Sequence, residues 1–205
     1  MKIIEPKAEL FDFVDTEATM KKLEKFGRVS HQSGGRPLHT YGAKKRTEEF
    51  VRMLIKKGHE SVLEHVSLTF HIICDRGVSH ELVRHRFASP TQESTRYVKY
   101  DGIEVAEPPF KNQDSHIIFD CAMDVAENAY RKLLEYGEPP EFARAVLPHA
   151  IKTELYVTAS LREWRHILKL RTDKAAHPQM RELMNQVLAV FKEKLPVIVE
   201  DIGNE

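Results

Sequence analysis

One stretch with the periodicity of a β-strand lies between two stretches with the periodicity of helices, and this order constrains the fold more than any other feature. In residues 66–72, apolar side chains alternate with polar ones, which is typical of a strand with one buried face. Residues 43–57 carry an apolar stripe at helical spacing, and Gly58 is a natural end for that helix. Residues 78–86 return to the helical period. The chain therefore needs both a sheet and helices.

The rest of the chain is predicted to add helices more than strands. Two further extended segments are expected, at 97–105 and at the β-branched stretch 151–158. Four further helices are expected, at 115–136, 141–147, 160–170 and 178–195. No repeat or linker-like composition divides the sequence. The fold class is therefore predicted to be α+β, as a single domain over residues 1–205 with a modest sheet and several long helices.

The overall charge of the chain is balanced. It has 31 Lys and Arg residues against 31 Asp and Glu residues, so no global field draws it toward nucleic acid or a membrane. Affinity for an anion must come from local clustering. Residues 1–13 have scattered charges and no uninterrupted apolar run, which is unlike a secretory signal or a membrane span. A cytoplasmic location, without membrane or nucleic-acid partners, is expected.

The two cysteines, Cys74 and Cys121, lie far apart in strand-like and helix-like segments. Isolated thiols among apolar neighbours are more often small core residues than a disulfide or a nucleophile. Both are therefore predicted to lie in the core.

Residues 84–97 bring three guanidiniums, one imidazole and several hydroxyls into one helix end and the loop behind it. Arginine forks match phosphate and carboxylate oxygens bidentately, so the segment is a candidate nucleotide-phosphate site. The alternative is a solvated basic face paired with nearby glutamates, and residue types alone favour neither interpretation.

The spacing within this segment resembles a known signature. Arg84-His85-Arg86, seven further residues and then Ser94 form the RHR(X)7S pattern of the flavin-dependent thymidylate synthases. Three other segments resemble elements of the same family in the expected order: the GHE(T/S) element at 58–61, the AR-x-x-LP element at 143–148, and the later flavin and nucleotide segment at 160–171. The resemblance covers about residues 58–171.

The resemblance implies two ligands with partly shared contacts. For FAD it implies contacts from His59, Ser61, Arg84, His85, Arg86, Gln92, Ser160, Arg162 and His166. For dUMP it implies contacts, some from a neighbouring subunit, by Glu81, Arg84, Gln92, Glu93, Ser94, Thr95, Arg96, Arg144 and Arg171. His59 could otherwise be only a cap or a surface residue.

Arg171 is the residue to which the resemblance assigns catalysis. The matching arginine of the family pairs with the uracil ring and favours ionisation at N3, which makes C5 more nucleophilic. A fixed cation beside developing negative charge is most effective in a dry site. Without the resemblance, an arginine extending to solvent at a helix end would be the favoured interpretation.

The sequence departs from the family pattern in two places. Many members carry Asn at the positions of Ser160 and His166, although both residues present here can still donate hydrogen bonds. Pro90-Thr91-Gln92 also differs from the Asn-Glu version of the signature loop. The side chain that meets the uracil ring is therefore left open.

Other cofactor motifs are absent from the sequence. The histidines and glutamates at 59–65 close neither a zincin motif nor its inverted form, so no metal site is predicted. No GxSxG elbow, Walker loop or dinucleotide fingerprint occurs either. The resemblance instead implies FAD clamped between subunits of a homotetramer with composite sites.

The implied reaction converts dUMP to dTMP without a cysteine nucleophile. Methylenetetrahydrofolate would supply the carbon, and NADPH-reduced FAD the hydride. A first alternative is a relative that alkylates another pyrimidine nucleotide, such as a cytidylate or hydroxymethyl-forming variant. A second is a non-catalytic nucleotide- or RNA-binding module that uses the arginines of 84–97 with Tyr97.

Overall fold

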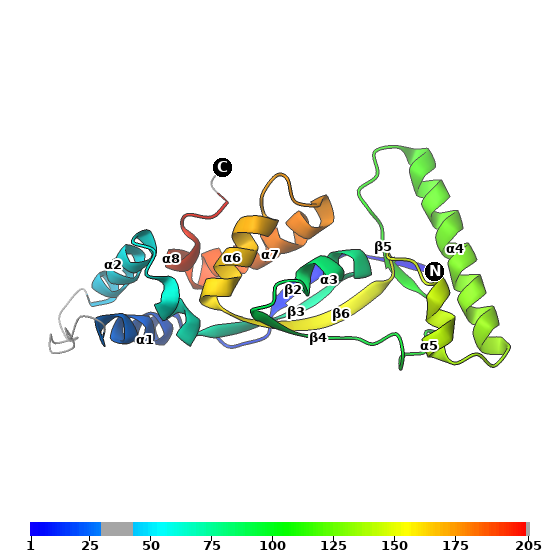
Figure 1. Ribbon diagram of the computed structural model, residues 1–205. Helices are drawn as coiled ribbons and strands as arrows, with labels where there is room; N and C mark the ends of the chain where they lie inside the picture. The colour runs from blue at the N-terminus through cyan, green and yellow to red at the C-terminus, as the bar shows by residue number, and fades with distance from the viewer. Residues whose placement is uncertain (30–42, 204–205) are drawn as a thin grey trace.

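The computed structural model describes residues 1–29 and 43–203, and its centre is a four-stranded antiparallel sheet (Figure 1). The strands lie in the order β2, β3, β6, β4, with bounds Lys7–Leu10, Ser67–Asp75, Lys152–Ser160 and Ala88–Gln92. The strands predicted at 66–72 and 151–158 are confirmed, and they form the two central strands of the sheet.

The sheet buries one face because side chains alternate along its strands. β3 and β6 pair from Ser67 opposite Ser160 to Asp75 opposite Lys152. Alternate residues of these two strands point into the core: Leu68, Phe70, Ile72, Cys74, Leu155, Val157 and Ala159.

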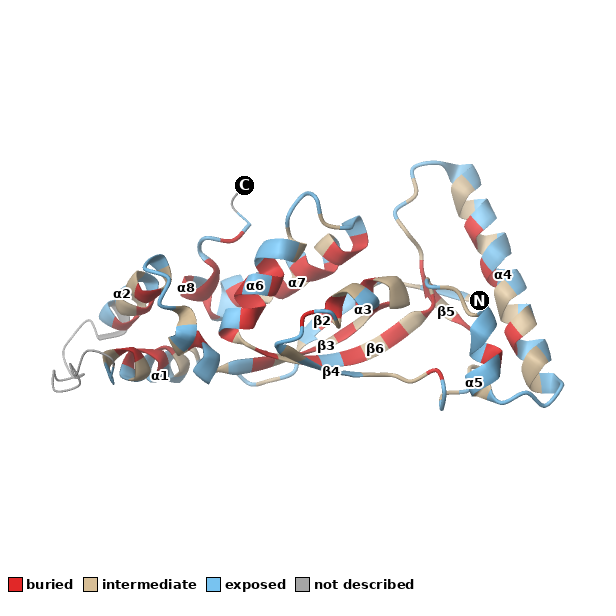
Figure 2. Ribbon diagram, viewed as in Figure 1, coloured by how far each residue is buried: buried red, intermediate tan, exposed pale blue. Residues whose placement is uncertain are grey.

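Helices cover this buried face, and within residues 1–29 and 43–203 no helix lies over the other face (Figure 1). The covering helices are α3 (Arg76–Leu82), α6 (Leu161–Arg171) and α7 (Pro178–Lys194). Their buried residues face the sheet (Figure 2). Trp164 of α6 is fully buried, and its Nε1 donates a hydrogen bond to the carbonyl oxygen of Leu68 at 2.9 Å. This indole therefore fixes α6 against β3.

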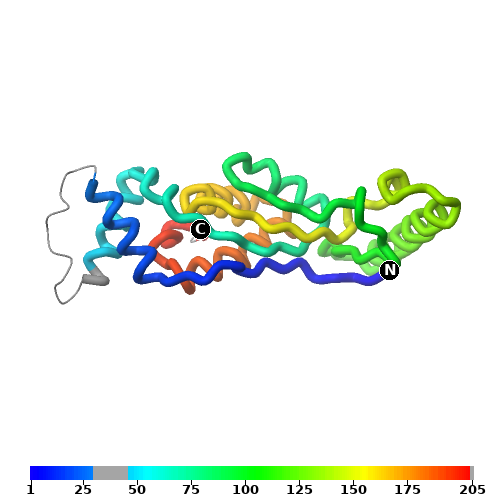
Figure 3. The backbone as a smooth tube through the Cα atoms, turned by 90° about the horizontal axis from the view of Figure 1, so that it is seen from below, coloured from blue at the N-terminus to red at the C-terminus, as the bar shows by residue number. Residues whose placement is uncertain are grey.

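The two ends of the elongated chain carry the remaining elements (Figure 3). One end holds α1 (Thr16–Val29), α2 (Ala43–Lys56), the 3-10 helix η1 (Glu60–His65) and α8 (Pro196–Val199). The other end holds β1 (Lys2–Ile4), β5 (Glu104–Ala106), α4 (Gln113–Glu135), α5 (Pro140–Ala143) and the 3-10 helix η2 (Arg144–Val146). That second end has its own small core of Ile103, Val105, Phe119, Met123 and Ile151.

The structure corrects the predicted secondary structure around the signature. The helix expected at 78–86 is α3, which begins at Arg76 because Asp75 caps it through the backbone N–H of Val78 at 2.8 Å. It ends at Leu82, so Arg84-His85-Arg86 forms a turn. Residues 88–92, expected in a loop, form the edge strand β4, where Pro90 is tolerated because an edge strand needs fewer donors.

Other predicted bounds also change. Of 97–105, only 104–105 are in a strand, and 141–147 divides into the short helices α5 and η2. The N-terminal residues, for which no element was predicted, supply β1, β2 and α1. The helices predicted at 43–57, 115–136, 160–170 and 178–195 are confirmed to within a few residues.

The predicted core position of the cysteines is correct for only one of them. Cys74 is buried in β3, and its burial raises the pKa of the thiol. Cys121 is exposed on α4, because it lies on the side of the helix opposite the residues that pack into the small core. Among the described residues, no helix is both long enough and apolar enough to cross a membrane.

Candidate functional site

A groove of about 740 Å³ runs beside α6, between η1 and the turn that follows α3. Its lining residues are Glu60, Glu64, Phe87, Ser160, Arg162, Glu163, Arg165, His166 and Lys169. Three of the nine residues predicted to contact FAD are among them: Ser160, Arg162 and His166. Ser160 is also the N-cap of α6, since its Oγ accepts the backbone N–H of Glu163 at 3.2 Å.

A buried arginine fixes one wall of the groove. Arg165 is only 1% exposed, and its guanidinium bonds Glu60 at 3.1 Å, Asp201 at 2.7 Å and the carbonyl oxygen of Ile198. The hydrogen bond from Arg165 holds the pKa of Asp201 well below its usual range. Glu60 of the GHE(T/S) element therefore joins η1 to α6, a role that the sequence did not indicate.

Arg171, at the end of α6, is held against α3 and the turn after it. Its Nη1 donates to Oε2 of Glu81 at 2.6 Å, and its Nη2 donates to the carbonyl oxygen of the same residue at 3.3 Å. Its Nε donates to Nε2 of His85 at 3.1 Å. The structure thus brings together three residues that the resemblance assigned to the site, from segments up to 90 residues apart.

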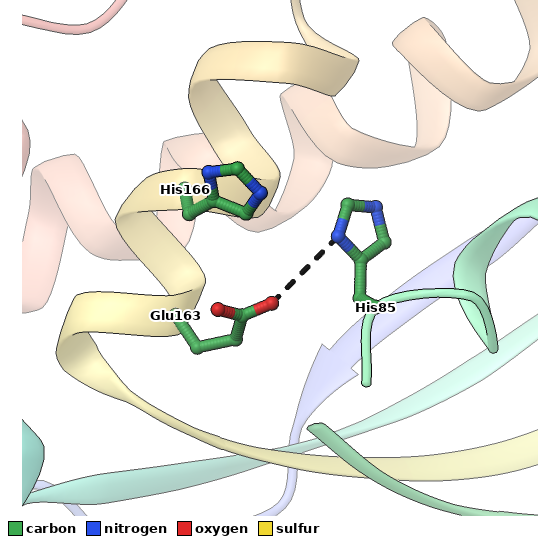
Figure 4. A group of neighbouring side chains, drawn as sticks. All are labelled: His85, Glu163 and His166. Carbon is green, nitrogen blue, oxygen red and sulfur yellow. Dashed lines mark ion pairs between the residues drawn. The ribbon is translucent and has the colours of Figure 1, made fainter. Parts of the chain in front are cut away.

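His85 lies in a small cluster with two residues of α6, Glu163 and His166 (Figure 4). Its Nδ1 is 3.7 Å from Oε1 of Glu163, and its ring meets that of His166 edge to face at 5.8 Å between centroids. Burial, followed by the charges of Arg171 and His166, lowers the pKa of His85 to about 4. Burial raises the pKa of Glu163. His85 is therefore neutral near pH 7.

This cluster also presents a donor set that transition metals use, with one ligand atom from each residue within 4.8 Å of the others. A nitrogen that binds a metal must be free of a proton. Nε2 of His85 already accepts a hydrogen bond from Arg171, so Nδ1 carries the proton. While Arg171 stays in place, the cluster therefore suits hydrogen bonding better than metal coordination.

The turn after α3 presents charge and an aromatic ring to solvent. Arg84 and Arg86 are exposed, and neither makes a hydrogen bond or an ion pair with the described part of the chain. Phe87, next to them, is 88% exposed and lines the groove. The N–H groups of these two arginines can bind phosphates, and the exposed ring of Phe87 can stack on a planar ring system. The turn therefore suits a ligand that has both.

A second group of predicted residues lies at the other end of the sheet. Nη1 of Arg144, in η2, donates to Oγ1 of the buried Thr95 at 3.3 Å. Arg96 lies 3.7 Å from a carboxylate oxygen of Glu141, and its guanidinium lies over the ring of Tyr97. Over residues 1–29 and 43–203, no hydrogen bond or ion pair joins this group to Arg171. The arginines predicted to bind dUMP therefore include two separate groups in one chain. One is Arg171 with Glu81 and His85, and the other is Arg96 and Arg144 with Thr95.

Three predicted dUMP contacts are engaged within the chain. The amide nitrogen of Gln92 donates to Ser79 and Thr153, and the carboxylate of Glu93 accepts the hydroxyl of Tyr100 at 2.5 Å. Oγ of Ser94 accepts the backbone N–H of Arg96. These contacts fix the strand end and the turn on which Thr95 and Arg96 lie.

His59 and Ser61 flank Glu60 in the chain, and both are exposed, but neither is among the residues that line the groove. His59 occupies the N-cap position of η1, but its side chain makes no capping hydrogen bond. Its side chain therefore does not cap this helix.

Sequence reasoning missed several residues of the groove: Glu60, Glu64, Phe87, Glu163, Arg165 and Lys169. One signal could have found Glu163. It lies three residues after Ser160 and three before His166, so a helix over 160–170 places all three on one face.

Taken together, the groove and the two arginine groups define a protein that binds anionic, nucleotide-like ligands. A family model described as "Thymidylate synthase complementing protein" matches residues 12–197. The flavin-dependent thymidylate synthase of Geobacter sulfurreducens is 40% identical over 159 residues, which is 75% of this chain and 68% of that protein. That of Mycolicibacterium gilvum is 34% identical over 205 residues, which is 91% of this chain and 81% of that protein.

A solved structure is similar over nearly the whole chain. The UMP/dUMP methylase PolB of Streptomyces cacaoi, bound with 5-Br dUMP, has a TM-score of 0.79 and 26% identity, and the match covers 97% of this chain and 95% of that one. The chain belongs to the family of flavin-dependent thymidylate synthases. The resemblance based on Arg84-His85-Arg86 and Ser94 is therefore confirmed.

Proposed function

We propose that this chain is a methyltransferase that converts dUMP to dTMP, with FAD as its flavin, methylenetetrahydrofolate as the carbon donor and NADPH as the reductant. The observation that carries the proposal is the family match over residues 12–197. A dUMP methylase with the same fold, solved with a dUMP analogue bound, supports the same substrate.

The geometry around Arg171 supports a role in holding the pyrimidine. An arginine has five N–H groups, and His85 and Glu81 use three of those on Arg171. One N–H remains on each terminal nitrogen. These two N–H groups can donate side by side to two neighbouring acceptors on a ring. A cation fixed in this way stabilises negative charge on the uracil ring and makes C5 more nucleophilic.

The groove beside α6 is the site we propose for FAD. Arg84 and Arg86 would hold its phosphates, and Ser160, Arg162 and His166 would bond the rest of the cofactor from α6. Ser61 of η1 and His59, the residue before this helix, would add contacts from either side of Glu60. When bound, FAD supplies the hydride that completes the methyl group. The residues of the chain would orient the ligands and exclude water.

The proposed dUMP site combines one arginine group from one copy of the chain with the other arginine group from a second copy. Thr95, Arg96 and Arg144 lie away from Arg171 within one chain, so one copy would supply Arg171 and another the phosphate contacts. This arrangement supports a homotetramer with sites at subunit interfaces.

The outer face of α4 supports such an assembly. Ile117, Ile118 and Val125 are 56%, 69% and 68% exposed, and Cys121 lies between them at helical spacing. A row of exposed apolar side chains of this kind marks a surface that another chain covers. A second copy is the occupant we propose for it.

The settings of the two cysteines support chemistry without a cysteine nucleophile. Cys74 is a core residue of β3 whose pKa is raised by burial, and Cys121 lies on α4, away from the groove. The double variant Cys74→Ala, Cys121→Ser should keep dTMP formation within about threefold of the wild type, because neither thiol acts on substrate. Steady-state turnover measures this, with Cys121→Ser alone as the control. Loss of turnover at an unchanged melting temperature would contradict the cysteine-independent reaction.

The proposed function can be tested on the purified chain. With FAD it should show a visible flavin spectrum that NADPH bleaches faster when dUMP is present, and with methylenetetrahydrofolate it should form dTMP. Turnover of dCMP in place of dUMP would instead identify a cytidylate-modifying relative. A protein that takes up no FAD and forms no dTMP would refute the proposal.

A further inference from the structure

Among the described residues that line the groove, Glu163 is the one buried carboxyl group, and it has no role in the reaction proposed above. It is 8% exposed and comes from α6, and within the described residues His85 is the one basic side chain with a nitrogen within 4.0 Å of its carboxylate. Charged side chains are rarely buried unless the structure uses the charge or the hydrogen-bonding capacity.

The hydrogen bond from Arg171 identifies which tautomer of His85 is present. A guanidinium can only donate, so Nε2 of His85, at 3.1 Å from Nε of Arg171, must be the acceptor. A neutral imidazole with an accepting Nε2 carries its single proton on Nδ1. Nδ1 is the ring nitrogen that faces Glu163 in Figure 4, and its 3.7 Å distance from Oε1 is longer than a hydrogen bond, so the carboxylate acts on the Nδ1 proton as a nearby negative charge and acceptor.

A chain of four groups therefore runs from Glu163 through His85 and Arg171 to Glu81. We infer that Glu163 is a positioning residue that keeps the proton of His85 on Nδ1, so that Nε2 stays available to orient Arg171. The inference rests on the proposed function for its effect on turnover, but the tautomer itself does not depend on that function. Without an acceptor beside Nδ1, the imidazole can carry its proton on Nε2, where it would oppose the N–H of Arg171.

The surroundings of Glu163 favour acceptance of this proton over a separate ion pair. Arg162 is bonded to Glu64, Arg165 to Glu60 and Asp201, and Lys169 to Asp201. The cations that line the same groove thus have other carboxylates as partners. Of the two histidines beside Glu163, His166 is exposed and His85 is buried, so water competes less for the contact with His85.

Three variants separate the acceptor from the charge. Glu163→Gln keeps a carbonyl oxygen beside Nδ1 and should retain kcat for dTMP formation within about threefold. Glu163→Leu removes the acceptor at similar volume and should lower kcat by about 10- to 100-fold with FAD content unchanged. Glu182→Leu, which changes an exposed glutamate of α7, is the matched control and should behave like the wild type.

The tautomer is measured directly by nitrogen NMR of histidine-labelled protein, with the His85 signals assigned by their loss in His85→Gln. The proton should be on Nδ1 in the wild type and in Glu163→Gln, and should shift toward Nε2 in Glu163→Leu. Equal losses of kcat in the Gln and Leu variants, or an unchanged tautomer in the Leu variant, would overturn the role of Glu163. If the wild type formed no dTMP, the proposed function would fail, while the tautomer result would still decide this inference.

Discussion

At the scale of single residues, the planar fork of Arg171 predicts that a lysine could not take its place in the proposed site. One side of the guanidinium is used by Glu81 and His85, and two N–H groups remain for a ligand. A lysine has three N–H groups on one atom and cannot hold two partners and a ring edge in a plane.

Arg171→Lys should therefore lower kcat for dTMP formation by about 100-fold or more while FAD remains bound. Turnover and the flavin spectrum of the same preparation measure the two effects. Arg181→Lys is the matched control, since that arginine of α7 bonds only the carbonyl oxygen of Lys174 among the described residues. Full activity of Arg171→Lys would show that charge alone suffices.

The low pKa of His85 predicts a loss of stability in mild acid. Its pKa is lowered to about 4 in the folded chain, first by burial and then by Arg171 and His166, against about 6.5 in an unfolded chain. Between these values the unfolded state binds the extra proton, so the free energy of unfolding falls as the pH decreases. The loss is at most about 3 kcal/mol by pH 4.

Urea unfolding of the wild type and His85→Gln between about pH 4 and 7 measures this contribution. The free energy of unfolding of the variant should fall less steeply as the pH decreases. The difference in slope should correspond to at most one bound proton. The comparison is needed because the raised pKa of Glu163 acts in the opposite direction, stabilising the folded chain at lower pH. Parallel curves for the two proteins would mean that His85 does not stay neutral in the folded state.

The contacts of these residues mark a limit of prediction from sequence. The signature residues could be assigned to a site because their spacing is local, and Glu163 could have been added from its place on the same helix face as Ser160 and His166. The bond between Glu81 and Arg171 could not, because 90 residues separate them and only the fold of α6 over the sheet brings them together.

At the scale of elements, the position of α6 depends on a buried arginine as well as on apolar packing. Arg165 joins α6 to η1 through Glu60 and to the C-terminal segment through Ile198 and Asp201. The partners of Arg165 lie 105, 33 and 36 residues away in the sequence. The helical pattern of 160–170 therefore does not indicate that Arg165 is buried.

Arg165→Met should lower the free energy of unfolding by about 2 to 4 kcal/mol, since it leaves the buried carbonyl oxygen of Ile198 without this donor. Chemical denaturation measures the loss. Lys169→Met, which also removes a contact to Asp201 but from a half-exposed side chain, is the control and should cost less than about 1 kcal/mol. Equal effects would indicate that the network adds little beyond surface charge.

Periodicity predicted the elements that bury a regular face, namely β3, β6 and the long helices. It failed for β4, because five residues with a proline form a strand only through the partner strand β6. It also extended α3 by four residues, since the helical pattern continues past Leu82 while the chain turns to bring His85 under α6.

At the scale of the whole molecule, the elongated shape places the two arginine groups at different parts of the sheet. Arg171 lies where α6 meets α3, and Arg144 lies in η2 at the end that α4 covers (Figure 1). The mixed fold of helices and a small sheet was predictable from the order of the elements. This separation was not, because it depends on how far the sheet extends between α6 and α5.

The separation makes a prediction about mixed assemblies. If one copy supplies Arg171 and another supplies Arg144, then Arg171→Ala and Arg144→Ala should each abolish most dTMP formation alone. Co-assembled in equal amounts, they should recover up to about a quarter of wild-type activity, because some sites then combine an intact Arg171 from one chain with an intact Arg144 from the other.

The two variants are unfolded, mixed and refolded together, and turnover is compared with that of each variant refolded alone. A mixture of Arg171→Ala with Glu81→Ala is the control, because both changes fall in the same arginine group and no mixed site can hold an intact one. Recovery in the first mixture and none in the second would locate the site between copies. No recovery in either would mean that each site takes both arginines from one chain, and the exposed row on α4 would then need another explanation.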